Sequence, residues 1–183
     1  NRTQVSVRSN AAGHKAGGLF SMESAGVLVE SGAALIFESN TATTGGGLYL
    51  EGNSMLTATG QGTRVAVKSN TAEEDAGGMY AQTGANISLA RGSLLLAQNN
   101  TATSYFGGGV YLASENTTLA ATGENTRVTV ESNRAGRHGG GVYLTQGADL
   151  LVESGATLVV QRNTAVRSNR TGDRSITLLS NTI

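Results

Sequence analysis

The sequence contains no cysteine, no proline and no tryptophan, and aromatic residues make up only 4% of it. The absence of cysteine excludes a disulfide framework, a thiolate metal site and a cysteine nucleophile. High glycine without proline excludes collagen and argues against a flexible linker. Because large rings are scarce while 38% of the residues are hydrophobic, a core has to be built from small aliphatic and β-branched side chains.

An excess of charge of one sign is missing as well, since thirteen basic residues balance thirteen acidic ones. A neutral chain has no basic field for nucleic acid, so no nucleic-acid partner is expected. There is no apolar run of about 18 residues, which predicts that this segment does not span a membrane. A length of 183 residues suits one domain, covering residues 1–183.

Glycine is abundant, with 26 copies, and much of it recurs in a fixed pattern. Five segments share two glycines, an aliphatic residue or methionine, and an aromatic residue. They are Gly17-Gly18-Leu19-Phe20, Gly46-Gly47-Leu48-Tyr49, Gly77-Gly78-Met79-Tyr80, Gly108-Gly109-Val110-Tyr111 and Gly140-Gly141-Val142-Tyr143. The second glycines are 29, 31, 31 and 32 residues apart, which indicates a repeat protein.

A second marker precedes each glycine pair, namely two apolar residues in alternation followed three residues later by asparagine. The asparagines are Asn10, Asn40, Asn70, Asn99, Asn133 and Asn163, at spacings of 30, 30, 29, 34 and 30. A shortened copy, Ile176/Leu178/Asn181, follows without glycines. The largest irregularity is the excess of four residues between Asn99 and Asn133, and it contains an aromatic pair, Tyr105 and Phe106.

The apolar residues within each repeat alternate with period two, and Val, Ile, Thr and Tyr are frequent, which indicates strands. A unit of about 30 residues with three strands cannot bury its own apolar face, but stacked copies share one core. We therefore predict an all-β fold, a right-handed parallel β-helix (solenoid) with five full rungs plus fragments, a rung being one circuit of the chain. Strands paired on both sides need every backbone N–H, which explains the missing proline.

The recurring asparagines are expected at a tight corner, because asparagine tolerates left-handed backbone angles and its amide can bond its stacked copies. We predict an asparagine ladder along the solenoid. Neither end of the sequence carries a capping helix. The sequence is thus expected to be a segment of a longer repetitive protein, with possible end-to-end self-association through open rungs.

Phe37-Glu38-Ser39-Asn40 followed by Gly45-Gly46-Gly47-Leu48 resembles the repeats of the chlamydial polymorphic outer-membrane protein family, which combine Gly-Gly-x-aliphatic with Phe-x-x-Asn. The resemblance implies the β-helical passenger of an autotransporter, displayed at the cell surface and used for adhesion. Three features depart from the family pattern. The third motif position is glycine instead of alanine, valine or leucine replaces phenylalanine in the other copies, and no cysteine is present.

Catalysis on acidic polysaccharides would need acids and a base converging on one face. The outward column two residues before the asparagines reads Arg8, Glu38, Lys68, Ala97, Glu131 and Gln161, whose signs compensate one another as on a solvated face. Glu73-Glu74-Asp75 is expected to be a solvated turn, and His14 and His138 exposed loop residues far from each other. We predict no catalytic residues, no metal site and no cofactor.

The aromatic residues Phe20, Tyr49, Tyr80, Tyr111 and Tyr143 occupy one equivalent position and are predicted to form an outward column. Such a column is able to bind a glycan or protein, and equally to brace the corner by stacking, and the sequence leaves both open. Tyr105 and Phe106 are a second candidate binding feature, on the irregular loop.

These patterns predict a non-enzymatic, extracellular or cell-surface structural and adhesion module whose partners are glycans or host and other cell-surface proteins. The alternative is a polysaccharide lyase or epimerase of the pectin-lyase-like kind, or an inactive relative. A minor alternative is an ice-binding protein, since Thr41/Thr43 and Thr101/Thr103 resemble a threonine array, although Glu73, Gly136 and Val166 interrupt it.

Overall fold

The computed structural model describes residues 3–166, and every regular element in that range is a β-strand. The shortened repeat copy at Ile176, Leu178 and Asn181 lies outside the described residues.

The strands form four parallel sheets, numbered here in the order in which each rung passes through them after its glycine pair. Sheet 1 contains β2 (Leu19–Ser21), β6 (Leu48–Leu50), β10 (Met79–Gln82), β14 (Val110–Ala113) and β18 (Val142–Thr145). Sheet 2 contains β3 (Gly26–Glu30), β7 (Met55–Thr59), β11 (Asn86–Ala90), β15 (Thr118–Thr122) and β19 (Asp149–Glu153). Sheet 3 contains β1 (Gln4–Arg8), β4 (Ala34–Glu38), β8 (Arg64–Lys68), β12 (Leu94–Gln98), β16 (Arg127–Glu131) and β20 (Thr157–Gln161). Sheet 4 contains β5 (Thr41–Ala42), β9 (Thr71–Ala72), β13 (Thr101–Ala102), β17 (Arg134–Ala135) and β21 (Thr164–Ala165).

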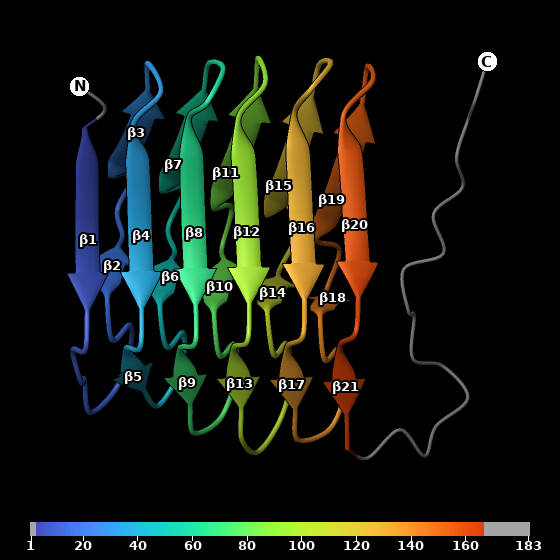
Figure 1. Cartoon of the computed structure of the whole chain (residues 1–183). Helices are drawn as coiled ribbons and strands as arrows, with labels where there is room; N and C mark the ends of the chain where they lie inside the picture. The colour runs from blue at the N-terminus through green and yellow to red at the C-terminus, as the bar shows by residue number, and fades with distance from the viewer. Residues whose placement is uncertain (1–2, 167–183) are drawn as a thin grey trace.

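Each strand pairs with its equivalents in the neighbouring rungs, and within residues 3–166 only the first and last strand of each sheet have a single partner, so the chain is a parallel β-solenoid (Figure 1). Rung 1 runs from β2 to β5, and rung 5 from β18 to β21. The predicted all-β solenoid of about five rungs is confirmed. Each rung carries three longer strands, as predicted, and in addition a two-residue strand of sheet 4, which is too short to show a period of two in the sequence.

The core is a continuous stack of the inward side chains of sheets 1, 2 and 3. Leu48 and Leu50 are fully buried on the inner face of β6, with Tyr49 on the opposite face, as the alternation predicts. Sheet 2 contributes the predicted pairs, such as Ile87 with Leu89, which align with Leu56 and Ala58 in the rung before. Full burial of a leucine or valine side chain contributes about 1.5–3 kcal/mol to folding. Because these side chains are buried against the equivalent residues of adjacent rungs, each rung is stabilised mainly by its neighbours.

An asparagine ladder follows sheet 3, made of Asn10, Asn40, Asn70, Asn100, Asn133 and Asn163. From Asn40 onward, each side-chain oxygen accepts two hydrogen bonds from the preceding asparagine, one from its backbone N–H and one from its side-chain amide. For Asn100 the donors are the backbone N and the Nδ2 of Asn70, at 3.0 and 3.1 Å. Each side-chain amide from Asn40 onward also donates to a carbonyl of the previous rung, such as Val67 O for Asn100. The ladder therefore ties all the described rungs together from inside.

The prediction that Asn99 belongs to this ladder is wrong, because Asn99 is exposed and its neighbour Asn100 is fully buried. The strand before it is shifted by one residue. Leu95 and Ala97 face the core, and the outward column passes through Gln98, which pairs with Lys68 and Glu131, instead of Ala97. The sequence fits both registers, because it has three successive leucines, Leu94–Leu96, and two successive asparagines, Asn99 and Asn100. Leu94 and Leu96 with Asn99 match the repeat as well as Leu95 and Ala97 with Asn100 do.

The correct ladder spacings are 30, 30, 30, 33 and 30, so rung 4 has an excess of three residues and not four. The excess is spread over three places. The pairing offset rises from 31 for Met79 with Val110, to 32 for Asn86 with Thr118, and to 33 for Leu94 with Arg127. The connections from sheet 4 to sheet 1, from sheet 1 to sheet 2 and from sheet 2 to sheet 3 are thus each one residue longer than in the rung before.

Ser54 is the one buried side chain among residues 3–166 whose polar atom has no hydrogen-bond partner. Alanine occupies the equivalent position, the residue before sheet 2, in rungs 1, 3 and 5. We expect Ser54→Ala to raise the free energy of unfolding by about 1 kcal/mol, because it removes an unsatisfied hydroxyl.

Chemical denaturation measures this change, and Ser93→Ala is its matched control. Ser93 is equally buried, but its hydroxyl donates to Ala58 O at 2.9 Å and accepts from Ala90 N at 3.1 Å. Ser93→Ala should therefore destabilise the protein. Destabilisation by Ser54→Ala as well would contradict the prediction.

Candidate functional site

The predicted aromatic residues lie in one column on the outer face of sheet 1. The strand pairing places Phe20 beside Tyr49, and then Tyr80, Tyr111 and Tyr143 in successive rungs. Tyr49 and Tyr80 are stacked with their centroids 4.8 Å apart, and the other neighbours meet edge to face at 4.7 to 5.4 Å. These are the separations that aromatic pairs prefer, so each ring stabilises the next.

Most of the aromatic column is covered. Tyr49 and Tyr111 are only 3% and 9% exposed, whereas Phe20 at the first rung is 41% exposed. The ring surfaces of the inner members are occupied by neighbouring rings, as in the bracing alternative. A ligand has direct access to the ring of Phe20, and a binding role for the column as a whole stays a prediction.

A second column runs beside the aromatic rings, formed by the loops that lead from sheet 4 into sheet 1. The backbones of Lys15 and Thr44 form an isolated parallel β-bridge, and those of Phe106 and His138 form another. Between them, the backbone carbonyl of Asp75 accepts a hydrogen bond from the N–H of Gly45. These loops lie next to the aromatic column because the glycines that follow them bring the backbone in close.

The irregular loop joins the aromatic column through one of its two aromatic residues. Phe106 stacks on Tyr143 at 4.7 Å and on His138 at 5.6 Å, so His138 packs against rings instead of being a free loop residue. Tyr105 instead lies under the guanidinium of Arg137, 4.8 Å from its ring centroid. The predicted pair is thus a cluster with Arg137 and His138, which were not assigned to it from the sequence, since they are more than thirty residues away.

A polar network borders the tyrosines at rungs 2 and 3. Glu51 accepts from Lys15 at 2.8 Å and from Gln82 at 3.0 Å, and Tyr80 donates to Gln82 at 3.1 Å. Lys15 also lies 4.8 Å from the ring centroid of Tyr49. Burial raises the pKa of Glu51, but the hydrogen bonds from Lys15 and Gln82 outweigh it and the net pKa is lowered.

For the tyrosines of this network the net pKa shift is upward, because no hydrogen bond outweighs the effect of burial. Burial raises the pKa of Tyr80 to about 12, with the charges of Asp75 and Glu51 adding to the rise. Burial likewise raises the pKa values of Tyr49 and Tyr111. These tyrosines are therefore protonated at neutral pH and do not act as bases, and the hydroxyl of Tyr80 donates to Gln82.

Asp75, the last residue of the acidic run, is half-buried, while Glu73 and Glu74 are exposed as predicted for a solvated turn. Burial raises the pKa of Asp75, the N–H of Phe106 at 3.0 Å partly opposes this, and Glu74 adds to it. The folded state therefore holds the proton more tightly than the unfolded chain, and the stability that this contributes is lost as pH rises through the folded pKa.

We expect Asp75→Asn to be more stable than the parent protein at pH 7, with a gain that shrinks as pH falls toward 4. The amide oxygen still accepts from Phe106, and no carboxylate remains to be desolvated. Thermal melting at pH 4, 5.5 and 7 measures the difference. Asp149→Asn, at an exposed position of β19, is the control, and a gain for Asp75→Asn that is independent of pH would contradict the reasoning.

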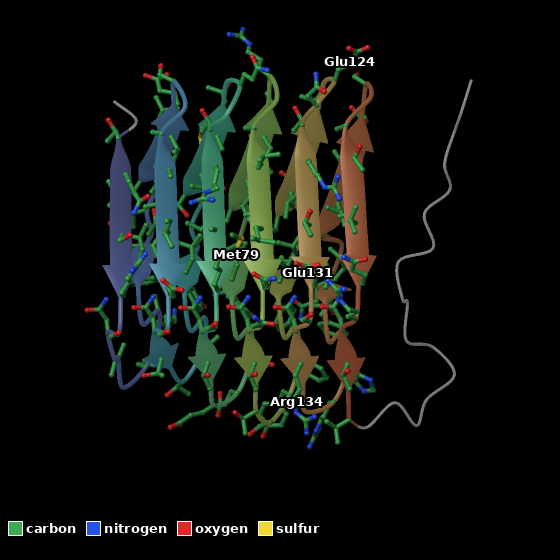
Figure 2. The ribbon with its side chains drawn as sticks, in the orientation of Figure 1. Met79, Glu124, Glu131 and Arg134 are labelled. Carbon is green, nitrogen blue, oxygen red and sulfur yellow. The ribbon has the colours of Figure 1, made fainter. Side chains whose placement is uncertain are left out.

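The outer face of sheet 3 is internally compensated. Arg8 pairs with Glu38 at 3.2 Å, and Glu131 accepts from Gln98, Gln161 and Arg162 at 2.7–2.8 Å. Glu131 lies on this face in Figure 2, toward the end of β16. The carboxylates here are tied to neighbouring rungs, as predicted for a solvated, charge-balanced face.

The geometry gives little support to a metal site or to an ice-binding threonine array. No group of three His, Cys, Asp or Glu side chains within residues 3–166 is arranged to hold a metal ion. The outward positions of sheet 4 read Thr41, Thr71, Thr101, Arg134 and Thr164, so a charged side chain interrupts the threonine array (Figure 2).

One hollow in the surface was missed from the sequence. It lies where sheet 1 turns into sheet 2, has a volume of about 500 Å³, and is lined by six polar side chains and Gly84. The six are Asn53, Thr83, Ser114, Glu115, Asn116 and Gln146. The extra residue in the 114–117 corner could have revealed it. However, the wrong assignment of Asn99 to the ladder concealed how the three additional residues of rung 4 are distributed.

A family model described as right handed beta helix region matches residues 5–183. The match covers nearly the whole sequence, and the chain belongs to the right-handed β-helix family. No curated protein and no solved structure was found to match the chain. In the range 3–166, none of the elements is a helix with the length and hydropathy needed to cross a membrane.

Proposed function

We propose that this chain is a non-enzymatic β-helical module, secreted or displayed at the cell surface, that acts as a stalk and contacts glycans or host and other cell-surface proteins. The observation that carries the proposal is the internal satisfaction of the outer faces. The acidic side chains of sheet 3 bond neighbouring rungs, and the rings beside sheet 1 stack on one another. Such faces suit a rigid scaffold more than a reacting centre.

The repeat resemblance to the chlamydial polymorphic outer-membrane proteins supports the same proposal. In those proteins β-helical repeats are displayed at the cell surface and used for adhesion. A module of that kind needs exposed contact residues on a stiff rod, and Phe20 and Arg137 provide them here, with Tyr105 half-buried under Arg137.

The aromatic contact is tested on a glycan array with Phe20→Ala and with Leu28→Ala as control. Leu28 is another large exposed side chain, 62% exposed on sheet 2 and outside the aromatic column. If the column contributes to binding, Phe20→Ala weakens it clearly while lowering the melting temperature by only the few degrees expected from the lost contact with the Tyr49 ring, and Leu28→Ala leaves binding unchanged. Equal binding by both variants would remove the column from the contact surface.

The second candidate function is cleavage of a polysaccharide, and one observation favours it. Asp75 and Glu51 both interact electrostatically with Tyr49 and Tyr80, and their pKa values are shifted in opposite directions. Glycoside-cleaving enzymes use a pair of carboxyl groups whose pKa values are shifted apart, so that one acts as the acid and the other as the base. Glu51, however, is engaged by Lys15 and Gln82, which favours a structural ion pair.

Glu51→Gln separates the two candidates. An enzyme of this type would release new chain ends from its polysaccharide, and the variant would lose that activity while remaining folded. If the chain is the proposed module, neither the parent protein nor Glu51→Gln releases chain ends. The variant then shows only a modest loss in the free energy of unfolding, about 1 kcal/mol or less, as expected for a partly exposed ion pair.

A further inference from the structure

The corner between sheet 1 and sheet 2 is regular except in rung 4. The pairing of Ala81 with Leu112 and of Asn86 with Thr118 gives five residue steps in rung 3 and six in rung 4. In rung 5 the count returns to five, between Leu144 and Asp149. The corner of rung 4 is therefore longer by one residue than the corners on both sides of it.

The longer corner forms one wall of the hollow. Glu115 and Asn116 are exposed at its tip, while the shorter corner of rung 3 contributes Thr83 and Gly84. A Cβ on Gly84 would overlap the side-chain oxygen of Asn53. The absence of a side chain at Gly84 leaves room for the Asn53 amide to lie within the hollow.

The polar side chains of the hollow have no partners of their own. Among residues 3–166, no hydrogen bond or ion pair engages the side chains of Asn53, Thr83, Ser114, Glu115, Asn116 or Gln146. By contrast, the backbone below them is paired, for example Asn53 N with Thr83 O at 3.0 Å. The hollow thus offers amides and hydroxyls for an external ligand, but no free strand edge for a peptide.

Resting on the proposed function, we propose that this hollow is the glycan-binding site of the module and takes a short, uncharged oligosaccharide. The lining groups come from four successive rungs at intervals of about 4.8 Å, a run of roughly 14 Å, which matches an extended ligand with repeated hydroxyl groups. None of the lining residues is basic and Glu115 is acidic, so the site disfavours anionic polysaccharides. It also lacks large apolar side chains, so there is no anchor pocket for a protein partner.

The site is tested by following backbone amide NMR signals while adding tetrasaccharides built from glucose, mannose or xylose, with tetragalacturonate as the anionic comparison. At least one neutral tetrasaccharide should shift the signals of Asn53, Thr83, Gly84, Asn116 and Gln146, and tetragalacturonate should not. Asn116→Ala should weaken the binding about tenfold, the effect of one or two lost hydrogen bonds.

The same rung contains a matched control. Glu-Asn-Thr occurs both at 115–117 and at 124–126, and Asn116 and Asn125 are both exposed with φ of 61° and 63°. The two threonines also make equivalent bonds, accepting from Gly84 N and Gly92 N at 3.1 and 3.0 Å. Asn125→Ala should therefore bind as the parent protein does.

The outcomes distinguish this inference from the proposed function. Shifts that map to Phe20, Tyr80 or Tyr143 instead would overturn the hollow as the site and leave a glycan-binding module. Equal weakening by Asn116→Ala and Asn125→Ala, or preference for tetragalacturonate, would overturn it as well. Release of new chain ends from any polysaccharide would overturn the proposed function itself.

Discussion

Asn100→Ala is expected to lower the free energy of unfolding by about 3–5 kcal/mol. The substitution leaves the Asn70 backbone N–H, the Val67 carbonyl and the Asn133 side-chain oxygen short of a partner in a region without access to water. Each such buried group costs about 1–3 kcal/mol. For a domain of this size the melting temperature should fall by roughly 10 °C.

Asn99→Ala is the control, and it decides the register as well. Asn99 is exposed and holds a left-handed backbone with φ of 56°, so its replacement by alanine should cost about 1 kcal/mol. Thermal and chemical denaturation of the two variants give the comparison. If Asn99→Ala were the more damaging change, the register of β12 and the position of the ladder would be wrong.

Gly77→Ala is expected to have a comparable effect for a different reason. A Cβ on Gly77 would overlap the backbone of Thr101 in the next rung, and backbone cannot move aside as a side chain can. The same close approach recurs at Gly46, Gly108 and Gly140, where the loop leads into sheet 1. We expect a loss of at least about 3 kcal/mol, the upper end for overpacking, with a lower yield of folded protein.

Gly26→Ala is the matched control for that substitution. Gly26 begins β3, is exposed, and has no atom within 4 Å of the position that a Cβ would occupy. Its replacement should change the melting temperature by no more than a few degrees. Equal tolerance of alanine at Gly77 and Gly26 would show that the rungs do not approach each other as closely as described.

The fold could be predicted because its signals repeat. A glycine pair, an alternating apolar pair and a buried asparagine recur about every 30 residues, and each has one physical reason that holds in every rung. The register of β12 could not be predicted, because Leu94-Leu95-Leu96 and Asn99-Asn100 fit two alternations equally well. Only the hydrogen bonds of the neighbouring rungs, from Asn70 and to Asn133, decide between them.

The candidate site was less predictable, since it depends on how residues from different rungs meet. The alignment of the aromatic residues followed from the repeat, but the burial of Tyr49 and the stacking of Phe106 on Tyr143 depend on loop positions. Similarly, the hollow is lined in part by a corner that is one residue longer than its neighbours. A period of about 30 residues does not reveal at which corner such a residue is placed.

The central claim is that this solenoid binds without reacting, and one incubation tests it most directly. The purified protein is mixed with a panel of acidic and neutral polysaccharides, with and without Ca²⁺, and both bound material and newly formed chain ends are measured. The account predicts binding of a neutral glycan with no new chain ends and no epimerised product. Turnover of any polymer would contradict it, and its loss in Glu51→Gln would then assign the reaction to the group beside Tyr49 and Tyr80.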